Sequence, residues 1–199
     1  MKIFSRGIIL AVAAVALVAF GFSSAQANYF DKTTSIGQYR VFYKSPSPAT
    51  CEAFILAVGT AMSRDSYDNL ANAITNTYGY VVIIIDHQPG SMTKMDAGKY
   101  RTCALEVQNN IVTWLYGAGL RSIAHWILGG HSAGGQAAQN AVGGDLSLAD
   151  AMFSIDPYNI DGASRIPIPG LYWGFNITTC FVEASDAAEA AYYYNDSHR

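Results

Sequence analysis

The stretch Ile123-Ala-His-Trp-Ile-Leu-Gly-Gly-His-Ser-Ala-Gly-Gly135 carries most of the information in this 199-residue sequence. Its first half is an apolar run typical of a buried strand, and its second half contains the pattern Gly-x-Ser-x-Gly, from Gly130 to Gly134. A serine on a tight turn between a strand and a helix needs neighbours almost without side chains two positions before and two positions after it. Gly130 and Gly134 meet that need, so the sequence predicts that Ser132 stands on a sharp strand-to-helix turn.

The rest of the chain repeats the same kind of short, almost wholly apolar run. Such runs, separated by helical patterns, predict an α/β fold with a mostly parallel central sheet and helices on both faces. Apolar residues at helical spacing predict one helix that begins near Asp65 or Ser66 and ends at Gly79, and a second over residues 104–115 that Gly117-Ala-Gly119 closes. The expected strands cover residues 53–60, 80–87, 123–130, 150–156 and 177–185.

Two further segments are interpreted from their composition. Residues 38–44 alternate in polarity, which is typical of a half-exposed strand, and we expect this strand at an antiparallel edge of the sheet. Residues 161–176 contain two prolines, three aromatic residues and few helix signals. We therefore expect a long loop there, near the functional face of the sheet.

The N-terminus has the parts of a secretory signal peptide. Two basic residues precede an apolar run at residues 7–22, and the small residues of Ser23-Ser-Ala-Gln-Ala27 follow it. The run is short for a membrane span, which needs about 20 apolar residues. Cleavage before Asn28 is therefore predicted, with an uncleaved anchor as the alternative. On this prediction residues 1–27 are removed, residues 28–199 form one domain, and the protein is secreted or periplasmic, without a stable membrane span.

Charge and cysteine content limit the classes of partner. The net charge is −3, cleavage would remove two basic residues, and no cluster of Lys and Arg is present, so no nucleic-acid partner is expected. Cys51, Cys103 and Cys180 would meet an oxidising compartment after export. One disulfide and one remaining thiol is then the simplest outcome, and the sequence leaves the pairing open. No CxxC spacing occurs, so we expect no structural zinc site.

Three phrases carry a resemblance to a known superfamily. They are Thr77-Tyr-Gly-Tyr-Val-Val-Ile-Ile-Ile-Asp86, Gly129-Gly-His-Ser-Ala-Gly-Gly135 and Ser154-Ile-Asp-Pro-Tyr-Asn-Ile-Asp-Gly162. Across nearly all of residues 28–199 the chain resembles the α/β-hydrolases, in the branch of platelet-activating-factor acetylhydrolases, chlorophyllases and bacterial polyester-cleaving cutinases. The resemblance implies an α/β-hydrolase fold, with Ser132 as nucleophile. It also implies that a C-terminal strand and helix are missing, because in most relatives these follow the strand placed here at 177–185.

A nucleophilic serine needs a base to take its proton and a carboxylate to orient that base. In the resembled fold both follow the serine along the chain, the carboxylate first and the histidine last. Asp156 is the first choice for the acid, because the third phrase resembles the chlorophyllase and acetylhydrolase form. Asp186 is the alternative acid, because it closes the next expected strand. His198 is the candidate base, because no other histidine follows Ser132.

The backbone N–H groups of Ala133 and Thr60 are expected to form the oxyanion hole, Thr60 on the resemblance to the polyesterases alone. His131, the variable residue of the Gly130 to Gly134 turn, is expected to be structural, with its side chain directed away from the Ser132 hydroxyl.

The resemblance thus implies a secreted serine hydrolase of the esterase, lipase or cutinase type. It would cleave carboxylic esters through an acyl-enzyme, as a monomer and without a cofactor or metal. Its substrates would be small-molecule, lipid or polyester esters, and three aromatic residues favour an apolar pocket: Tyr158, Tyr172 and Trp173. One rival is a truncated or non-catalytic relative that binds ligands without turnover because its base is missing. A metal-binding module using Asp86 and His87 is a third, weaker reading, because no further ligands cluster nearby.

Overall fold

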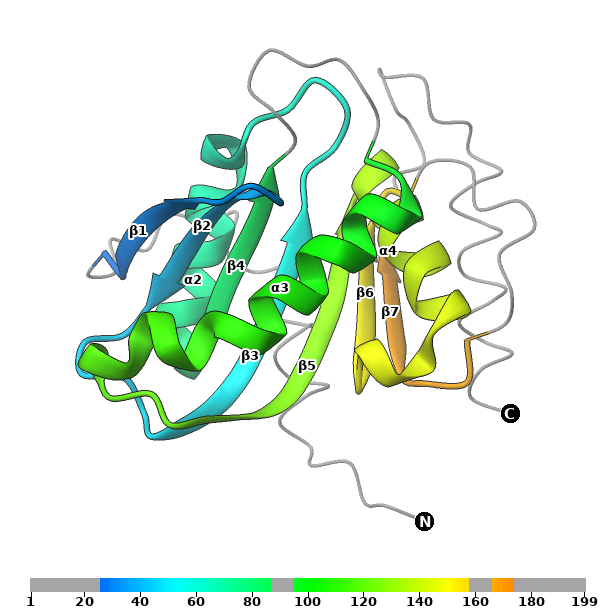
Figure 1. The fold of residues 1–199 in the computed structure, drawn as a ribbon. Helices are drawn as coiled ribbons and strands as arrows, with labels where there is room; N and C mark the ends of the chain where they lie inside the picture. The colour runs from blue at the N-terminus through cyan, green and yellow to red at the C-terminus, as the bar shows by residue number, and fades with distance from the viewer. Residues whose placement is uncertain (1–25, 87–94, 158–165, 174–199) are drawn as a thin grey trace.

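A seven-stranded mixed sheet runs through the molecule in the order β1-β2-β4-β3-β5-β6-β7 (Figure 1). This computed structural model describes residues 26–86, 95–157 and 166–173. Strands β4, β3, β5, β6 and β7 are mutually parallel, whereas β2 is antiparallel to β1 and to β4. The α/β class and the mostly parallel sheet are therefore confirmed. The strands are β1 (Asn28–Thr33), β2 (Gln38–Tyr43), β3 (Thr50–Ala57), β4 (Val81–Asp86), β5 (Ser122–His131), β6 (Ala151–Ile155) and β7 (Gly170–Trp173).

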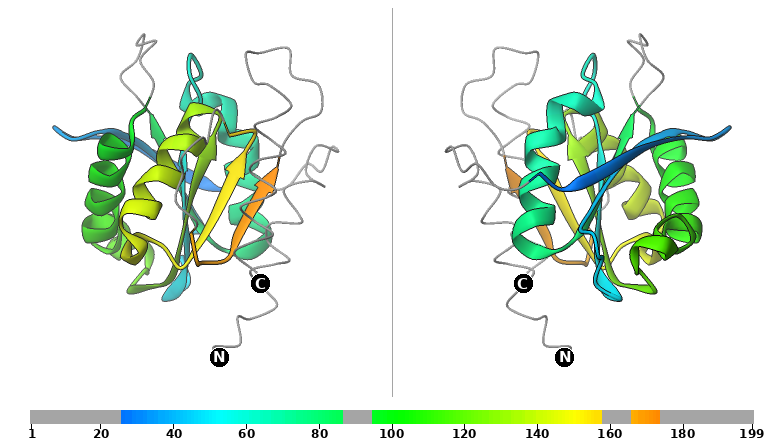
Figure 2. Two further views of the ribbon diagram at one scale, coloured as in Figure 1. Left: turned by 90° about the vertical axis from the view of Figure 1, so that its right-hand side faces the viewer. Right: turned by 90° about the vertical axis from the view of Figure 1, so that its left-hand side faces the viewer.

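Helices cover both faces of this sheet (Figure 2). Helix α2 (Asp68–Tyr78) lies on one face, and α3 (Ala97–Leu115) and α4 (Ala133–Gly144) lie side by side on the other. Three short 3-10 helices join these elements: η2 (Arg64–Tyr67), η3 (Tyr116–Ala118) and η4 (Leu146–Leu148).

The apolar run of β4 shows why its sequence lacks an alternating pattern. Successive side chains of a strand point to opposite faces of the sheet. Ile83 and Ile85 belong to the core under α3 and α4, whereas Val82 and Ile84 belong to the core under α2. All six residues of the strand are buried, so both faces require apolar side chains.

The predicted C-terminal ends of both helices are confirmed, whereas α3 begins earlier than the predicted residue 104, at Ala97. Gly79 ends α2 at φ 75°, and its N–H bonds to the carbonyl oxygen of Thr75. Gly119 closes η3, which follows α3, at φ 113°. Both glycines adopt left-handed backbone that other residues rarely adopt. The start of α2 lies later than predicted, at Asp68, because the 3-10 helix η2 occupies the preceding turn.

The expected edge position of residues 38–44 is wrong, because β1 lies outside β2 and pairs with it along its whole length. Most of β2 is buried. The polar residue that made the strand look half-exposed is Arg40, which is only 8% exposed. Its guanidinium binds the carboxylates of Asp31, Asp65 and Asp68. A buried arginine bound by carboxylates at the surface thus produced the same sequence pattern as a solvated strand face.

The expected loop over residues 161–176 is also wrong, because it contains β7, which pairs in parallel with β6. Pro167 and Pro169 both precede the strand, where a missing N–H breaks no ladder bond, and the aromatic residues after them favour extended backbone. The strand predicted at 177–185 lies outside the described residues. The sheet position next to β6 therefore belongs to Gly170–Trp173.

Cys51 and Cys103 do not pair with each other, and Cys180, the third cysteine, lies outside the described residues. Both are buried free thiols of the core under α3 and α4. Burial raises the pKa of Cys51 to about 11. Both side chains therefore act as small apolar core residues.

Candidate active site

Ser132 stands on the turn between β5 and α4, with a backbone conformation that ordinary residues avoid. Its φ is 51° and its ψ is −122°. A non-glycine residue in such a region carries strain of roughly 1–3 kcal/mol, which persists only where the surrounding structure imposes it. The side chain is half-buried, and the serine carbonyl accepts the N–H of Gln136 in the first turn of α4.

Three glycines around Ser132 allow α4 to pack directly on the sheet. A β-carbon on Gly130 would lie 2.4 Å from the carbonyl carbon of Gly134. A β-carbon on Gly134 would lie 2.5 Å from the carbonyl oxygens of Ala57 and Val58, and one on Gly135 would lie 2.4 Å from the hydroxyl of Ser154. Real β-carbons do not approach so closely. The packing of this turn therefore requires glycine at Gly130 and Gly134, where the closest atoms are backbone, whereas at Gly135 the closest atom belongs to the side chain of Ser154.

Asp156 lies beside the serine turn, at the end of β6. The N–H of Ser132 donates to the carbonyl oxygen of Ile155 at 2.9 Å, and Asp156 is the next residue. Asp156 has φ 45° and is 6% exposed. Its carboxylate lies near enough to His131 to act on the pKa of that imidazole. The structure therefore brings the predicted nucleophile and the first-choice acid together at the carboxyl ends of the neighbouring strands β5 and β6.

The turn that follows β3 packs against Ser132. It runs from Gly59 to Met62, and the N–H of Met62 closes it on the carbonyl oxygen of Gly59 at 3.2 Å. A β-carbon on Gly59 would lie 3.3 Å from the β-carbon of Ser132. Thr60, the predicted oxyanion donor, is exposed at the tip of this turn, and Ala61 beside it has φ 60°. Ala133, the other predicted donor, begins α4 directly after Ser132.

A residue that the sequence did not mark as functional connects these parts. The hydroxyl of Tyr67 accepts the N–H of Gly59 at 3.0 Å and lies 2.8 Å from Nδ1 of His131. Burial lowers the pKa of His131, and the carboxylate of Asp156 opposes this shift. Burial raises the pKa of Tyr67 to about 12, so its phenol stays protonated at neutral pH. In the sequence Tyr67 reads only as a member of an apolar helix stripe, and no pattern shows what its hydroxyl binds.

Several predicted residues lie outside the described part of the chain. These are the candidate base His198, the alternative acid Asp186, and Tyr158 and His87.

Asp86, the other residue of the suggested metal-binding module, is described, and its carboxylate accepts the N–H of Arg64 at 3.2 Å. Among residues 26–86, 95–157 and 166–173 no group of three His, Cys, Asp or Glu side chains is placed to hold a metal ion. Within the same ranges, no helix combines the length and the apolar character that crossing a bilayer requires.

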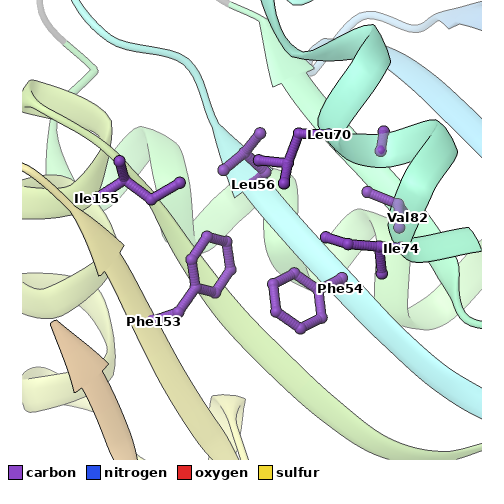
Figure 3. A pocket seen from close by; sticks show the side chains of 8 residues that line it. Phe54, Leu56, Leu70, Ile74, Val82, Phe153 and Ile155 are labelled. Carbon is purple, nitrogen blue, oxygen red and sulfur yellow. The ribbon is translucent and has the colours of Figure 1, made fainter. Parts of the chain in front are cut away.

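An apolar pocket lies on the α2 face of the sheet, where Leu70 and Ile74 of α2 face side chains of β3, β4 and β6 (Figure 3). The rings of Phe54 and Phe153 pack against each other at its centre, with centroids 4.4 Å apart and planes tilted by 35°. Ile155 lines its end nearest the serine turn. This pocket is built from strand and helix side chains. The apolar pocket predicted near Tyr158, Tyr172 and Trp173 stays a prediction, because those side chains lie outside what the structure describes.

No protein-family model and no curated protein sequence matches this chain.

Proposed function

We propose that the protein is a serine hydrolase of the α/β-hydrolase fold that cleaves carboxylic esters. The observation that carries the proposal is the conformation of Ser132, a strained residue on a glycine-packed turn between a central parallel strand and the helix that follows it. Such a turn holds a serine hydroxyl at the carboxyl end of a sheet, where a substrate reaches it. The strand order and the nearby Asp156 support the same proposal.

In the proposed reaction the oxygen of Ser132 attacks the ester carbonyl while a histidine takes the serine proton. The negative charge on the carbonyl oxygen is stabilised by the N–H groups of Ala133 and Thr60. The attack thus forms a tetrahedral intermediate. Its collapse expels the alcohol, which receives the proton from the histidine, and leaves the acyl group on Ser132. Water then attacks the acyl-enzyme by the same route, releasing the carboxylic acid and restoring the serine.

Asp156 is the acid that we assign. The case for its rival, Asp186, is that Asp186 closes the strand predicted at 177–185. The strand next to β6 is instead β7, which ends at Trp173, so that reason for choosing Asp186 no longer holds. Asp156 directly follows Ile155, the residue whose carbonyl oxygen binds the N–H of Ser132.

His198 is the base that we assign. The assignment rests on the sequence, in which no other histidine follows Ser132. His131 is a poor alternative, since its Nδ1 is engaged by Tyr67.

We also propose that the protein is exported and cleaved after Ala27. Strand β1 begins at Asn28, so cleavage there leaves every described strand and helix in place. N-terminal sequencing of exported protein should start at Asn28. Intact protein held in the membrane fraction would contradict this.

Labelling with a fluorophosphonate probe, which reacts with activated serines, tests the proposed activity. The parent protein should label, and Ser132→Ala, Asp156→Asn and His198→Gln should each lose most of the labelling, because the members of a triad act as a unit. Asp186→Asn should label like the parent. A folded parent that neither labels nor hydrolyses p-nitrophenyl esters would contradict the proposal and favour a ligand-binding relative without turnover.

A further inference from the structure

We propose that Tyr67 and His131 form a bridge that positions the turn Gly59–Met62, and with it the oxyanion donor at Thr60, against Ser132. This inference rests on the proposed function, because an oxyanion donor has a role only where Ser132 is a nucleophile. The two residues are positioning residues that act through the turn.

The bridge is made by one phenol that contacts three groups. Its oxygen accepts the N–H of Gly59 at 3.0 Å, and it lies 2.8 Å from Nδ1 of His131 and 3.1 Å from the sulfur of Met62. A phenol has a single proton, and an imidazole nitrogen accepts a hydrogen bond more strongly than a thioether does. His131, neutral and with its Nδ1 unprotonated, therefore receives the proton of Tyr67, and a lone pair of the same oxygen accepts the N–H of Gly59.

The turn needs such an anchor because its tip is exposed and strained. Thr60 and Ala61 are both exposed, and Ala61 adopts φ 60°, which costs free energy in a residue other than glycine. The N–H of Val58 bonds to the carbonyl oxygen of Ile85 and fixes the chain where it leaves β3. The bond from Gly59 to Tyr67 then fixes the first residue of the turn itself.

The bridge also lies in direct contact with the nucleophile. Ser132 follows His131 in the chain, and a β-carbon on Gly59 would lie 2.8 Å from Nδ1 of His131 and 3.3 Å from the β-carbon of Ser132. No side chain therefore separates the turn from the serine. Loss of the bridge would let the turn move relative to Ser132, which would misplace the donor at Thr60.

The test compares Tyr67→Phe with the parent in the hydrolysis of p-nitrophenyl butyrate. A donor displaced by a fraction of an ångström weakens the transition state and leaves ester binding in place, so kcat should fall about tenfold while KM stays unchanged. Tyr80→Phe is the matched control, since Tyr80 is equally buried in the same core under α2. It should keep the parent's kcat.

Two substitutions of His131 distinguish its role as a hydrogen-bond acceptor in the bridge from its role in filling space. In His131→Asn the amide oxygen stands near the place of Nδ1 and accepts the proton of Tyr67, whereas His131→Leu fills similar space without an acceptor. We expect His131→Asn to keep most of the parent's kcat and His131→Leu to lose as much as Tyr67→Phe. The double variant Tyr67→Phe, His131→Leu should be no slower than either single variant, because both remove one bridge.

The results distinguish this inference from the proposed function. If the parent does not react with the fluorophosphonate probe, the proposed function itself fails. If the parent reacts and Tyr67→Phe keeps its kcat, or if Tyr80→Phe loses as much kcat as Tyr67→Phe, the bridge has no positioning role and the inference is overturned. Equal losses in His131→Asn and His131→Leu would overturn it as well.

Discussion

Gly134, in the first turn of α4, packs against the carbonyl oxygen of Ala57 at the end of β3. A β-carbon at Gly134 would lie 2.5 Å from that oxygen, and the atoms that it would meet are backbone, which cannot rotate away. We therefore expect Gly134→Ala to destabilise the fold by about 1–3 kcal/mol through overpacking. It should also move the turn that carries Ser132 and so reduce its reaction with a fluorophosphonate. Urea unfolding and labelling rates measure the two effects.

Gly144→Ala is the matched control for this prediction. Gly144 ends the same helix, and a β-carbon there would meet nothing within 4 Å. Alanine at that position should leave stability unchanged or raise it by up to about 1 kcal/mol, since the unfolded chain loses conformational freedom. Equal effects of the two substitutions would show that the close approach of Gly134 to the sheet is not what the turn requires.

Tyr100 of α3 supplies a second prediction, because its hydroxyl enters the ladder between β3 and β5. The hydroxyl accepts the N–H of Gly129 at 3.0 Å and lies 3.2 Å from the carbonyl oxygen of the same residue. Tyr100→Phe would leave a buried N–H without a partner, so we expect a loss of about 1–3 kcal/mol in the free energy of unfolding. Urea titration beside Tyr80→Phe measures it, and equal losses in both variants would contradict the assignment.

The sequence was sufficient for the parts of the fold that depend on local chemistry. Gly79 and Gly119 stop helices because their backbone is left-handed. The run of β4 and the second half of β5, residues 127–130, lack polar residues because both sheet faces are buried there. The serine turn was predictable for a similar reason, since Gly130 and Gly134 are the residues that a close crossing of helix and strand demands.

The parts that could not be predicted depend on contacts between distant segments. Arg40 is buried because Asp31, Asp65 and Asp68 surround it, and only the fold brings these carboxylates to one place. Tyr67 reads in the sequence as an apolar helix residue, although its hydroxyl reaches Gly59 and His131. Such pairings have no local pattern.

The ion cluster around Arg40 gives a third prediction, on pH. The hydrogen bond to Arg40 holds the pKa of Asp31 below its ordinary value, although burial opposes it. A carboxylate whose folded pKa is lowered stabilises the fold above its unfolded pKa of about 3.9, and this stability is lost as the pH falls through the folded pKa. Asp31→Asn should therefore be less stable than the parent at pH 7, and the difference should shrink as the pH falls below about 4.

Acid titrations of stability by urea unfolding check this, and Arg40→Met provides the background that isolates the pair. In that background the effect of Asp31→Asn should become smaller, because the main charge that lowers the pKa of Asp31 is gone and only the longer contact with Arg64, at 3.4 Å, remains. A difference that persists undiminished well below pH 4, or one that is as large in Arg40→Met as in the parent, would show that Asp31 stabilises the fold by another route.

His131 gives the last prediction. It is a basic group, whereas Asp31 is acidic, but here too the stability of the fold should fall as the pH falls. Burial lowers its pKa, and Asp156 only partly offsets the shift, so the unfolded chain binds the proton of this histidine more readily than the fold does. Stability should therefore fall as the pH drops below about 6.5, the unfolded pKa of histidine, down to the lowered folded pKa. Compared with His131→Asn, the parent should lose stability over that window, and the loss should be retained in His125→Asn, which changes a histidine of the same strand. Urea unfolding at a series of pH values measures it, and a parent and His131→Asn with parallel pH profiles would show that protonation of His131 is not resisted by the fold.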